Sequence, residues 1–202
     1  SAASDVYKRQ GTLKITVIAT IVAVPIGLGA AIYLNEYASD RSRRIIKPIL
    51  EILAGIPTIV FGFFALTFIT PILRNLIPNL GEFNSISPGI VVGIMIVPMI
   101  TSMSEDAMSS VPDKIREGAF GLGATKFEVA TKVVLPAATS GVVASIVLGI
   151  SRAIGETMIV SLAAGSSPTS SLSLTSSIQT MTGYIVEIAT GDAAFGSDIY
   201  YS

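Results

Sequence analysis

The chain has 202 residues, of which 50% are hydrophobic and 13% are charged, and its mean hydropathy is +0.70. A soluble domain covers itself with more charge than this, so the composition indicates a membrane as the solvent. The net charge of −1 offers no basic surface for nucleic acid, and the lack of Cys and His excludes disulfides, thiol or imidazole catalysis and the zinc sites built on those ligands. We expect neither a metal site nor a cofactor.

Charge-free stretches predict where the chain crosses the bilayer, because a helical span needs about 20 mostly apolar residues. Uncharged runs of 21, 22, 22 and 19 residues separate Lys14 from Glu36, Glu51 from Arg74, Glu82 from Glu105, and Lys132 from Arg152. These runs predict an all-α, polytopic bundle with four spans, near residues 13–34, 48–73, 88–102 and 136–163.

Basic residues alternate between the expected loops, and this alternation predicts the orientation of the spans. The loops at 35–47 and 103–135 are rich in Lys and Arg, whereas 74–87 has a single Arg and 164–202 has none. By the positive-inside rule the first two loops are cytoplasmic and the other two are external. The basic run 41–47 is interpreted as a topology signal that also contacts lipid headgroups.

The two ends of the chain differ from those expected of a complete bundle. Residues 1–10 place Lys8 and Arg9 on the expected outer side, and they have neither a signal-peptide core nor a cap leading into the first span. We interpret 1–10 as a non-native scar and 11–202 as the transmembrane domain. The polar stretch that closes at Ser202 has no returning helix, so a last span is expected downstream.

The expected cytoplasmic loop 104–135 is long enough to fold by itself. Pro112 predicts a helix start, Gly123 predicts a left-handed helix end, and Thr125 with Glu128 predicts a capping box that opens a second helix.

The first of these two helices combines apolar and charged residues. It presents an apolar knob with a charged rim, which suits a groove on a partner protein. An amphipathic helix lying on the membrane is the alternative, but the loop lacks the broad Lys/Arg face that such helices use. The knob is Ile115, Ala119, Phe120 and Leu122, and the rim is Lys114, Arg116 and Glu117.

Within this loop, Glu117-Gly118-Ala119 is followed after three residues by Gly123, and after nine more by Val133, one further residue and Leu135-Pro136. This spacing resembles the EAA loop of binding-protein-dependent ABC importer permeases. Gly118 departs from the Ala usual there, which makes the helix less stable by about 1 kcal/mol and leaves the spacing intact. The resemblance implies a coupling helix that docks on an ATP-hydrolysing subunit through Glu117, Gly118, Ala119, Phe120, Gly123, Leu135 and Pro136.

Three further stretches, at 31–38, 53–62 and 152–158, resemble the phosphate-specific permeases of this family. Residues 104–108 and 156–158 are more similar to the C-type permease of that system than to its A-type partner. The resemblance covers 11–202 and lacks the family's first and last spans. It implies a phosphate importer of the inner membrane, in which this subunit pairs with an A-type permease, two ATPase subunits and an extracytoplasmic phosphate-binding protein.

Arg152 and Glu156 fall inside the fourth expected span, where an ionisable residue is costly and is a functional-site hypothesis by default. Their spacing of four places them on one helix face, where they could form a purely structural salt bridge. Alternatively, Arg152 binds a passing phosphate and Glu156 holds Arg152 when the path is empty. Ser151 and Thr157 could add hydroxyl donors to this path, or merely bond their own helix backbone.

An enzyme is not expected, because the chain has no His, no Cys and no paired carboxylates within the expected spans. The glycines at 118, 121 and 123 also lack the Lys of an ATP-binding phosphate loop. ATP hydrolysis would reside in the partner subunit. Three alternatives stay open: an importer of another oxyanion or solute such as molybdate or sulfate, a membrane-embedded enzyme that uses Glu51, Glu156 or an Asp, and a passive channel. A channel needs no docking loop for an ATPase.

Overall fold

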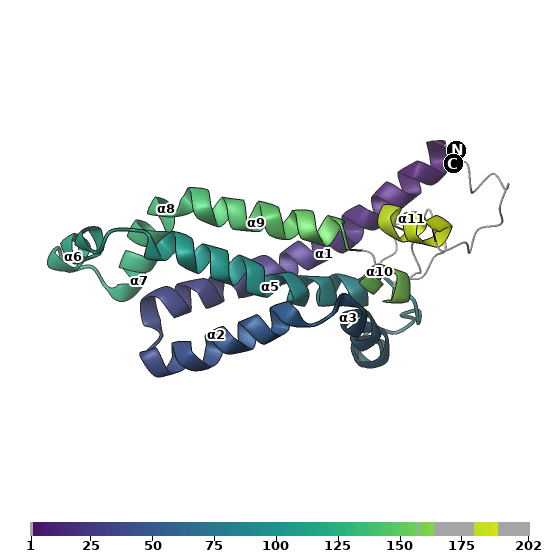
Figure 1. The fold of residues 1–202 in the computed structure, drawn as a ribbon, viewed down its shortest axis with the longest axis horizontal. Helices are drawn as coiled ribbons and strands as arrows, with labels where there is room; N and C mark the ends of the chain where they lie inside the picture. Colours follow the sequence, from purple (N-terminus) through teal and green to yellow (C-terminus); the bar gives the residue numbers. More distant parts are fainter. Residues whose placement is uncertain (1, 157, 164–179, 190–202) are drawn as a thin grey trace. The chain divides into compact units, whose positions relative to one another are not determined.

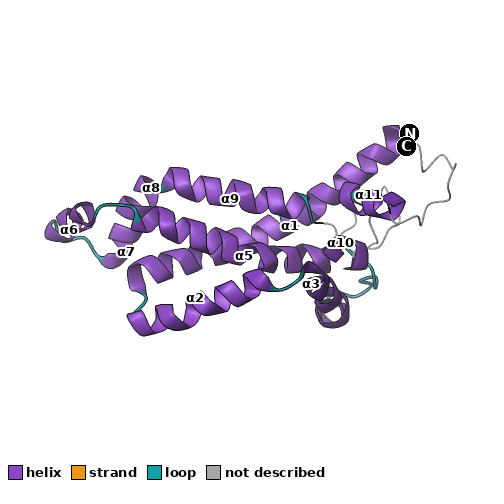
Figure 2. Cartoon of the chain, viewed as in Figure 1, coloured by secondary structure: helices purple, strands orange, loops and turns teal. Residues whose placement is uncertain are grey.

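The computed structural model describes residues 2–156, 158–163 and 180–189, and all of the regular structure in them is helical (Figure 2). The expected all-α class is confirmed. The chain divides into two compact units, one of residues 1–21, 56–94 and 152–202 and the other of 22–55 and 95–151. Three long helices contribute to both units: α1 (Ala2–Ile32), α5 (Ile86–Ser109) and α9 (Thr139–Ile154) (Figure 1).

The first unit holds the beginnings of α1 and α5 together with shorter helices. Within it α10 packs against α3, and α11 packs against α10. Gly89 of α5 lies so close to α1 that a Cβ there would come within 2.6 Å of Ile18 Cγ2, so a residue without a side chain allows this approach. The shorter helices are α3 (Thr58–Phe64), the π-helix η2 (Ala65–Ile69), α4 (Thr70–Leu76), α10 (Met158–Ala163) and α11 (Met181–Ala189).

The π-helix η2 has a local cause in Pro71. Proline lacks an amide hydrogen, and its ring presses on the preceding helical turn. Just before it the helix widens, so that the Thr70 N–H donates to the Ala65 carbonyl five residues earlier. The Thr70 hydroxyl at 3.0 Å and the Ser87 hydroxyl of α5 at 2.8 Å donate to the same carbonyl. These bonds tie the widened turn to α5.

The second unit holds the ends of α1 and α5, most of α9, and the loop between α5 and α9. A buried apolar cluster draws on all of these segments, so the loop is part of the packed unit. The cluster consists of Ala31, Met108, Val111, Val129, Val134, Ala138 and Val142. The other elements are the π-helix η1 (Tyr33–Tyr37), α2 (Asp40–Gly55), α6 (Asp113–Gly121), α7 (Lys126–Glu128), the π-helix η3 (Val129–Val134) and α8 (Leu135–Ala137).

In this unit α5 and α9 run side by side (Figure 1). Small residues on α9, namely Gly141, Ser145 and Gly149, recur every four positions and face α5. A Cβ at Gly141 would overlap the methyl group of Ala107, and the Ser145 hydroxyl lies 2.8 Å from that of Ser104. Small residues at this spacing let two helices approach closely inside a membrane.

Several helices are long and apolar enough to cross a membrane. Lys8–Tyr37, Thr58–Leu76 and Ile86–Ser109 qualify singly, and Lys126–Ala137 with Thr139–Ile154 qualify as a pair bent by 75°. The first helix includes residues 2–10, which the sequence analysis placed outside the span.

The expected span 48–73 crosses a helix break. α2 ends at Gly55, and α3 begins at Thr58 with Pro57 as its N-cap. The ring of a proline disfavours the helical conformation at the residue before it, and this accounts for the break at Ile56, which precedes Pro57. The expected span 136–163 is likewise interrupted after Ile154, whereas α5 runs six residues into the expected loop, through 104–109.

Candidate functional site

α6 begins and ends where the sequence predicts. Pro112 takes its N-cap position, and Gly123 beyond its end has φ +86°, a left-handed conformation that favours glycine. The Gly123 N–H donates to Phe120 O at 2.9 Å, and the Ala124 N–H donates to Ala119 O at 3.1 Å. These two bonds make a Schellman motif, which stops the helix and turns the chain towards α7.

The second predicted start signal is also confirmed, because Thr125 and Glu128 form a reciprocal capping box. The Glu128 N–H donates to Thr125 Oγ1 at 3.3 Å, and the Thr125 N–H donates to Glu128 Oε2 at 3.0 Å. Each side chain thereby satisfies a backbone group at the helix start. The loop is therefore a built helix–turn–helix element.

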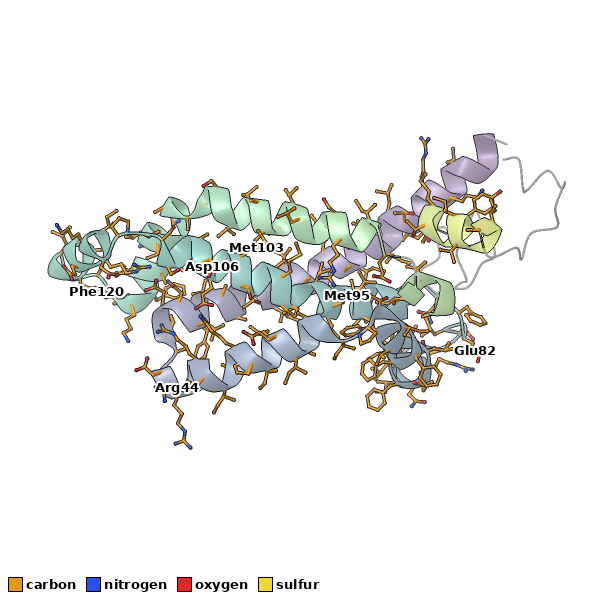
Figure 3. The ribbon with its side chains drawn as sticks, in the orientation of Figure 1. Arg44, Glu82, Met95, Met103, Asp106 and Phe120 are labelled. Atoms are coloured by element: carbon orange, nitrogen blue, oxygen red, sulfur yellow. The ribbon has the colours of Figure 1, made fainter. Side chains whose placement is uncertain are left out.

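Large apolar side chains are exposed on this element, and we call this set the loop apolar surface. Leu122 is 92% exposed and Phe127 is 67% exposed, with Ile115 and Phe120 somewhat less so. Figure 3 shows Phe120 on α6, at the far end of the second unit. Exposed apolar patches are typically covered by a partner protein, a ligand or a membrane. Glu117, Gly118 and Gly123 are exposed beside them.

Two of the predicted coupling residues face inward. Ala119 and Leu135 pack against the buried cluster of the second unit, so they hold the loop in place. The sequence pattern placed Ala119 in the exposed apolar knob, and this prediction is wrong. Pro136 is exposed, and it follows η3, where the Leu135 N–H reaches back five residues to Ala130 O. As at Pro71, the wider turn precedes a proline.

Arg116 was predicted to lie in the charged rim, and this prediction is wrong. Its side chain is only 14% exposed and pairs with Glu36 of η1, with Nε 3.2 Å from Oε1. Sequence reasoning assigned no role to Glu36. The sequence did hold a signal for Glu36: it is the first charged residue after the uncharged run 15–35, and it lies in the stretch 31–38 that resembles the family.

Lys47 of α2 and Glu105 of α5 form a second ion pair of this unit, with Nζ 3.0 Å from Oε1. Both line a pocket of about 190 Å³ together with Glu51 and Asp106, and Figure 3 shows Asp106 on α5. Lys47 thus contacts a carboxylate of its own unit, whereas Arg44 points away from the other helices of that unit (Figure 3).

The predicted substrate-path residues begin with Ser151 and Arg152 in the last turns of α9, and both are exposed. The Ser151 hydroxyl donates to Val147 O at 2.8 Å, so its proton is bonded within its own helix. Among the residues that the structure describes, the ion pairs do not include Arg152.

Glu156 does not share a helix face with Arg152, because α9 ends at Ile154. Its side chain is largely buried and its Oε1 accepts the Ile159 N–H of α10 at 3.3 Å. Its carbonyl accepts the Thr182 hydroxyl of α11 at 3.0 Å. The expectation of one continuous helix through both residues is wrong. Thr157, the fourth predicted residue, lies outside the described residues.

The fold and this element define a helical membrane protein whose folded loop exposes an apolar surface. The family described as binding-protein-dependent transport system inner membrane component matches residues 23–196, and the chain belongs to this family. It is therefore a multi-pass component of the inner membrane, and its family is one of transport components rather than of enzymes.

Named relatives agree with this membership. The chain is 35% identical to "Probable ABC transporter permease protein YqgH" of Bacillus subtilis, with 93% of this chain and 60% of that protein covered. It is 39% identical to "Phosphate transport system permease protein PstC" of Haemophilus influenzae, with 78% and 56% covered. The chain thus spans somewhat more than half the length of these relatives.

A solved structure has the same fold. A chain of the MetNI methionine ABC transporter, in an inward facing conformation, superposes with a TM-score of 0.71. The match covers 95% of this chain and 82% of that one at 19% sequence identity.

Proposed function

We propose that the protein is the permease subunit of an ATP-driven phosphate importer, of the C-type. The observation that carries this proposal is α6, a capped helix with the spacing of an EAA loop and an exposed apolar surface beside it. A helix of this kind fits a groove on a partner protein. Relatives named as phosphate transport permeases, at up to 39% identity, support the choice of substrate.

The partners follow from this role. We expect a second permease of the A-type, two ATPase subunits docked at the loop apolar surface on the cytoplasmic side, and an extracytoplasmic protein that delivers phosphate. Closure of the ATPases on nucleotide would displace α6, and the spans would then rock between outward and inward access. The proposed role of this chain is to convert the motion of the ATPases into a change in which side of the membrane the substrate path opens to.

Arg152 is the residue that we expect to meet the substrate. Its exposed guanidinium offers paired donors to a tetrahedral oxyanion. Ser151 is a weaker candidate because its hydroxyl proton is bonded within α9. The buried carboxylate of Glu156 caps α10, so we assign it the task of shaping the segment that follows Arg152. Thr157 stays a proposed hydroxyl donor.

Another oxyanion is the second candidate, since an arginine does not by itself select phosphate over sulfate or molybdate. The name of the Bacillus subtilis relative specifies no substrate, which leaves this alternative open. Competition during uptake separates the two: an importer of phosphate is inhibited by unlabelled phosphate and not by equal sulfate or molybdate.

The test is uptake of radiolabelled phosphate by the full-length permease, reconstituted with its partner permease, ATPase and binding protein. Arg152→Gln should abolish uptake while the complex stays assembled, whereas Arg74→Gln, at an exposed arginine of α4, should not. Glu117→Lys should prevent binding of the ATPase, and Glu82→Lys, the same charge reversal in a loop expected to be external, should not. Normal uptake by Arg152→Gln would remove the site, and no uptake by the wild-type complex would remove phosphate as the substrate.

A further inference from the structure

Arg116 connects α6 to two other segments of the second unit. Its Nη2 donates to Met108 O at 2.7 Å and its Nη1 donates to Val111 O at 2.7 Å, both in the chain that leads from α5 into the loop. Nη1 also lies 3.1 Å from Asp113 Oδ1, and Nε donates to Glu36 Oε1 at 3.2 Å. A single side chain thus bridges the end of α5, the start of α6 and η1.

The Glu36 end of this bridge is itself held in place. The Glu36 side chain is 8% exposed, and its Oε1 also accepts the Asn35 side-chain amide at 2.6 Å. Arg43 of α2 also bonds to this segment, and it donates to Leu34 O at 2.8 Å and to Asn35 O at 3.2 Å. η1, which follows the first long helix, is therefore hydrogen-bonded to two arginines, one from α2 and one from α6.

The contacts of Arg116 need a guanidinium. Its three nitrogen atoms donate to four different acceptors, and the planar head of arginine carries five donors in a fixed fork, whereas a lysine is a single compact charge. α6 contains no fully buried residue, and besides the apolar contact of Ala119 with the buried cluster, Arg116 makes the side-chain hydrogen bonds that join this helix to the rest of the unit. Removal of one partner from such a shielded pair leaves an uncompensated charge.

We propose that Arg116 is a positioning residue that couples α6 to η1, so that a displacement of α6 is passed directly to the end of α1. This inference rests on the proposed function, in which α6 docks on the ATPase. The loop apolar surface then receives the force and Arg116 transmits it. The expected consequence of losing Arg116 is ATP hydrolysis that no longer drives transport.

The experiment compares Arg116→Lys and Glu36→Gln with the control Arg74→Lys, the same conservative exchange at an exposed arginine of α4, in the reconstituted full-length complex. We measure ATPase association, ATP hydrolysis and phosphate uptake. Association should persist in all three. Uptake per ATP hydrolysed should fall about tenfold in the first two, a size typical of coupling between sites, and should stay unchanged in Arg74→Lys. The double variant should be no worse than the worse single one, because both remove the same connection.

Uptake per ATP equal to that of wild type in Arg116→Lys and in Glu36→Gln would overturn the inference and leave the proposed function standing. A wild-type complex that assembles without phosphate uptake would instead refute the proposed function. A readout that needs no transport then decides the inference: amide hydrogen exchange at 33–37 and 113–121 should speed up together in Glu36→Gln. Unchanged exchange at 33–37 would overturn it. Glutamine has the same shape as glutamate, so Glu36→Gln still tests the inference if Arg116→Lys does not fold.

Discussion

Ser104 of α5 and Ser145 of α9 have their hydroxyl oxygens 2.8 Å apart in a fully buried contact. The Ser145 hydroxyl donates to the Val142 carbonyl at 2.7 Å, so Ser104 supplies the proton of the shared bond. The contact is therefore asymmetric: Ser145 keeps a partner without Ser104, whereas Ser104 depends on Ser145.

This asymmetry predicts unequal costs for two alanine substitutions. Ser145→Ala leaves a buried donor without its acceptor and should destabilise the protein by about 1–3 kcal/mol. Ser104→Ala should cost about 1 kcal/mol or less, because Ser145 keeps its bond to Val142. Thermal unfolding of the detergent-solubilised protein measures both. Equal midpoints for the two variants would show that the proton is not placed as described.

The glycines of α9 and α6 should respond in opposite ways to alanine. Gly141→Ala would press a methyl group into Ala107 of α5, and since overpacking typically costs 1–3 kcal/mol, we expect a loss of about that size. Gly118→Ala meets no atom within 4 Å, and it should stabilise α6 by up to about 1 kcal/mol. The same unfolding measurement decides, and a stabilised Gly141→Ala would contradict the close packing of α5 on α9.

Gly123 provides a further test because it lies in open space but has φ +86°. Gly123→Ala therefore meets no steric neighbour, and any loss reports backbone strain alone, about 1 kcal/mol. Gly121→Ala is the matched control, since Gly121 lies inside α6 with equally open surroundings and an ordinary helical backbone. Proteolysis in the loop should increase for Gly123→Ala and not for the control. Equal cleavage of the two variants would argue against the Schellman ending.

The capping box predicts a loss at Thr125 that a nearby threonine does not share. Thr125→Ala removes the acceptor of the Glu128 N–H and should cost about 1 kcal/mol. Thr131→Ala removes a hydroxyl that only bonds back to Phe127 O at 2.7 Å, so its effect should be smaller. Hydrogen exchange at the Glu128 amide is the measurement, and it should speed up in Thr125→Ala. Unchanged exchange there would show that the box is not formed in solution.

The sequence alone determined the features that depend on neighbours within four residues. The start of α6 at Pro112, its left-handed end at Gly123 and the capping box at Thr125 all follow from residue types at short spacing. The apolar runs indicated helices in a membrane for a similar reason, because a span must satisfy its own backbone hydrogen bonds.

Only the tertiary structure decided where long side chains point and where an apolar run breaks. Arg116 turns inward because its acceptors include Glu36, 80 residues away, and no local pattern reports so distant a partner. The predicted span carries no charged residue besides Arg152 and Glu156, yet its helix ends at Ile154, with the Glu156 carbonyl bonded to Thr182. Long-range contacts of this kind compete with local helix propensity, and their outcome depends on the assembled fold.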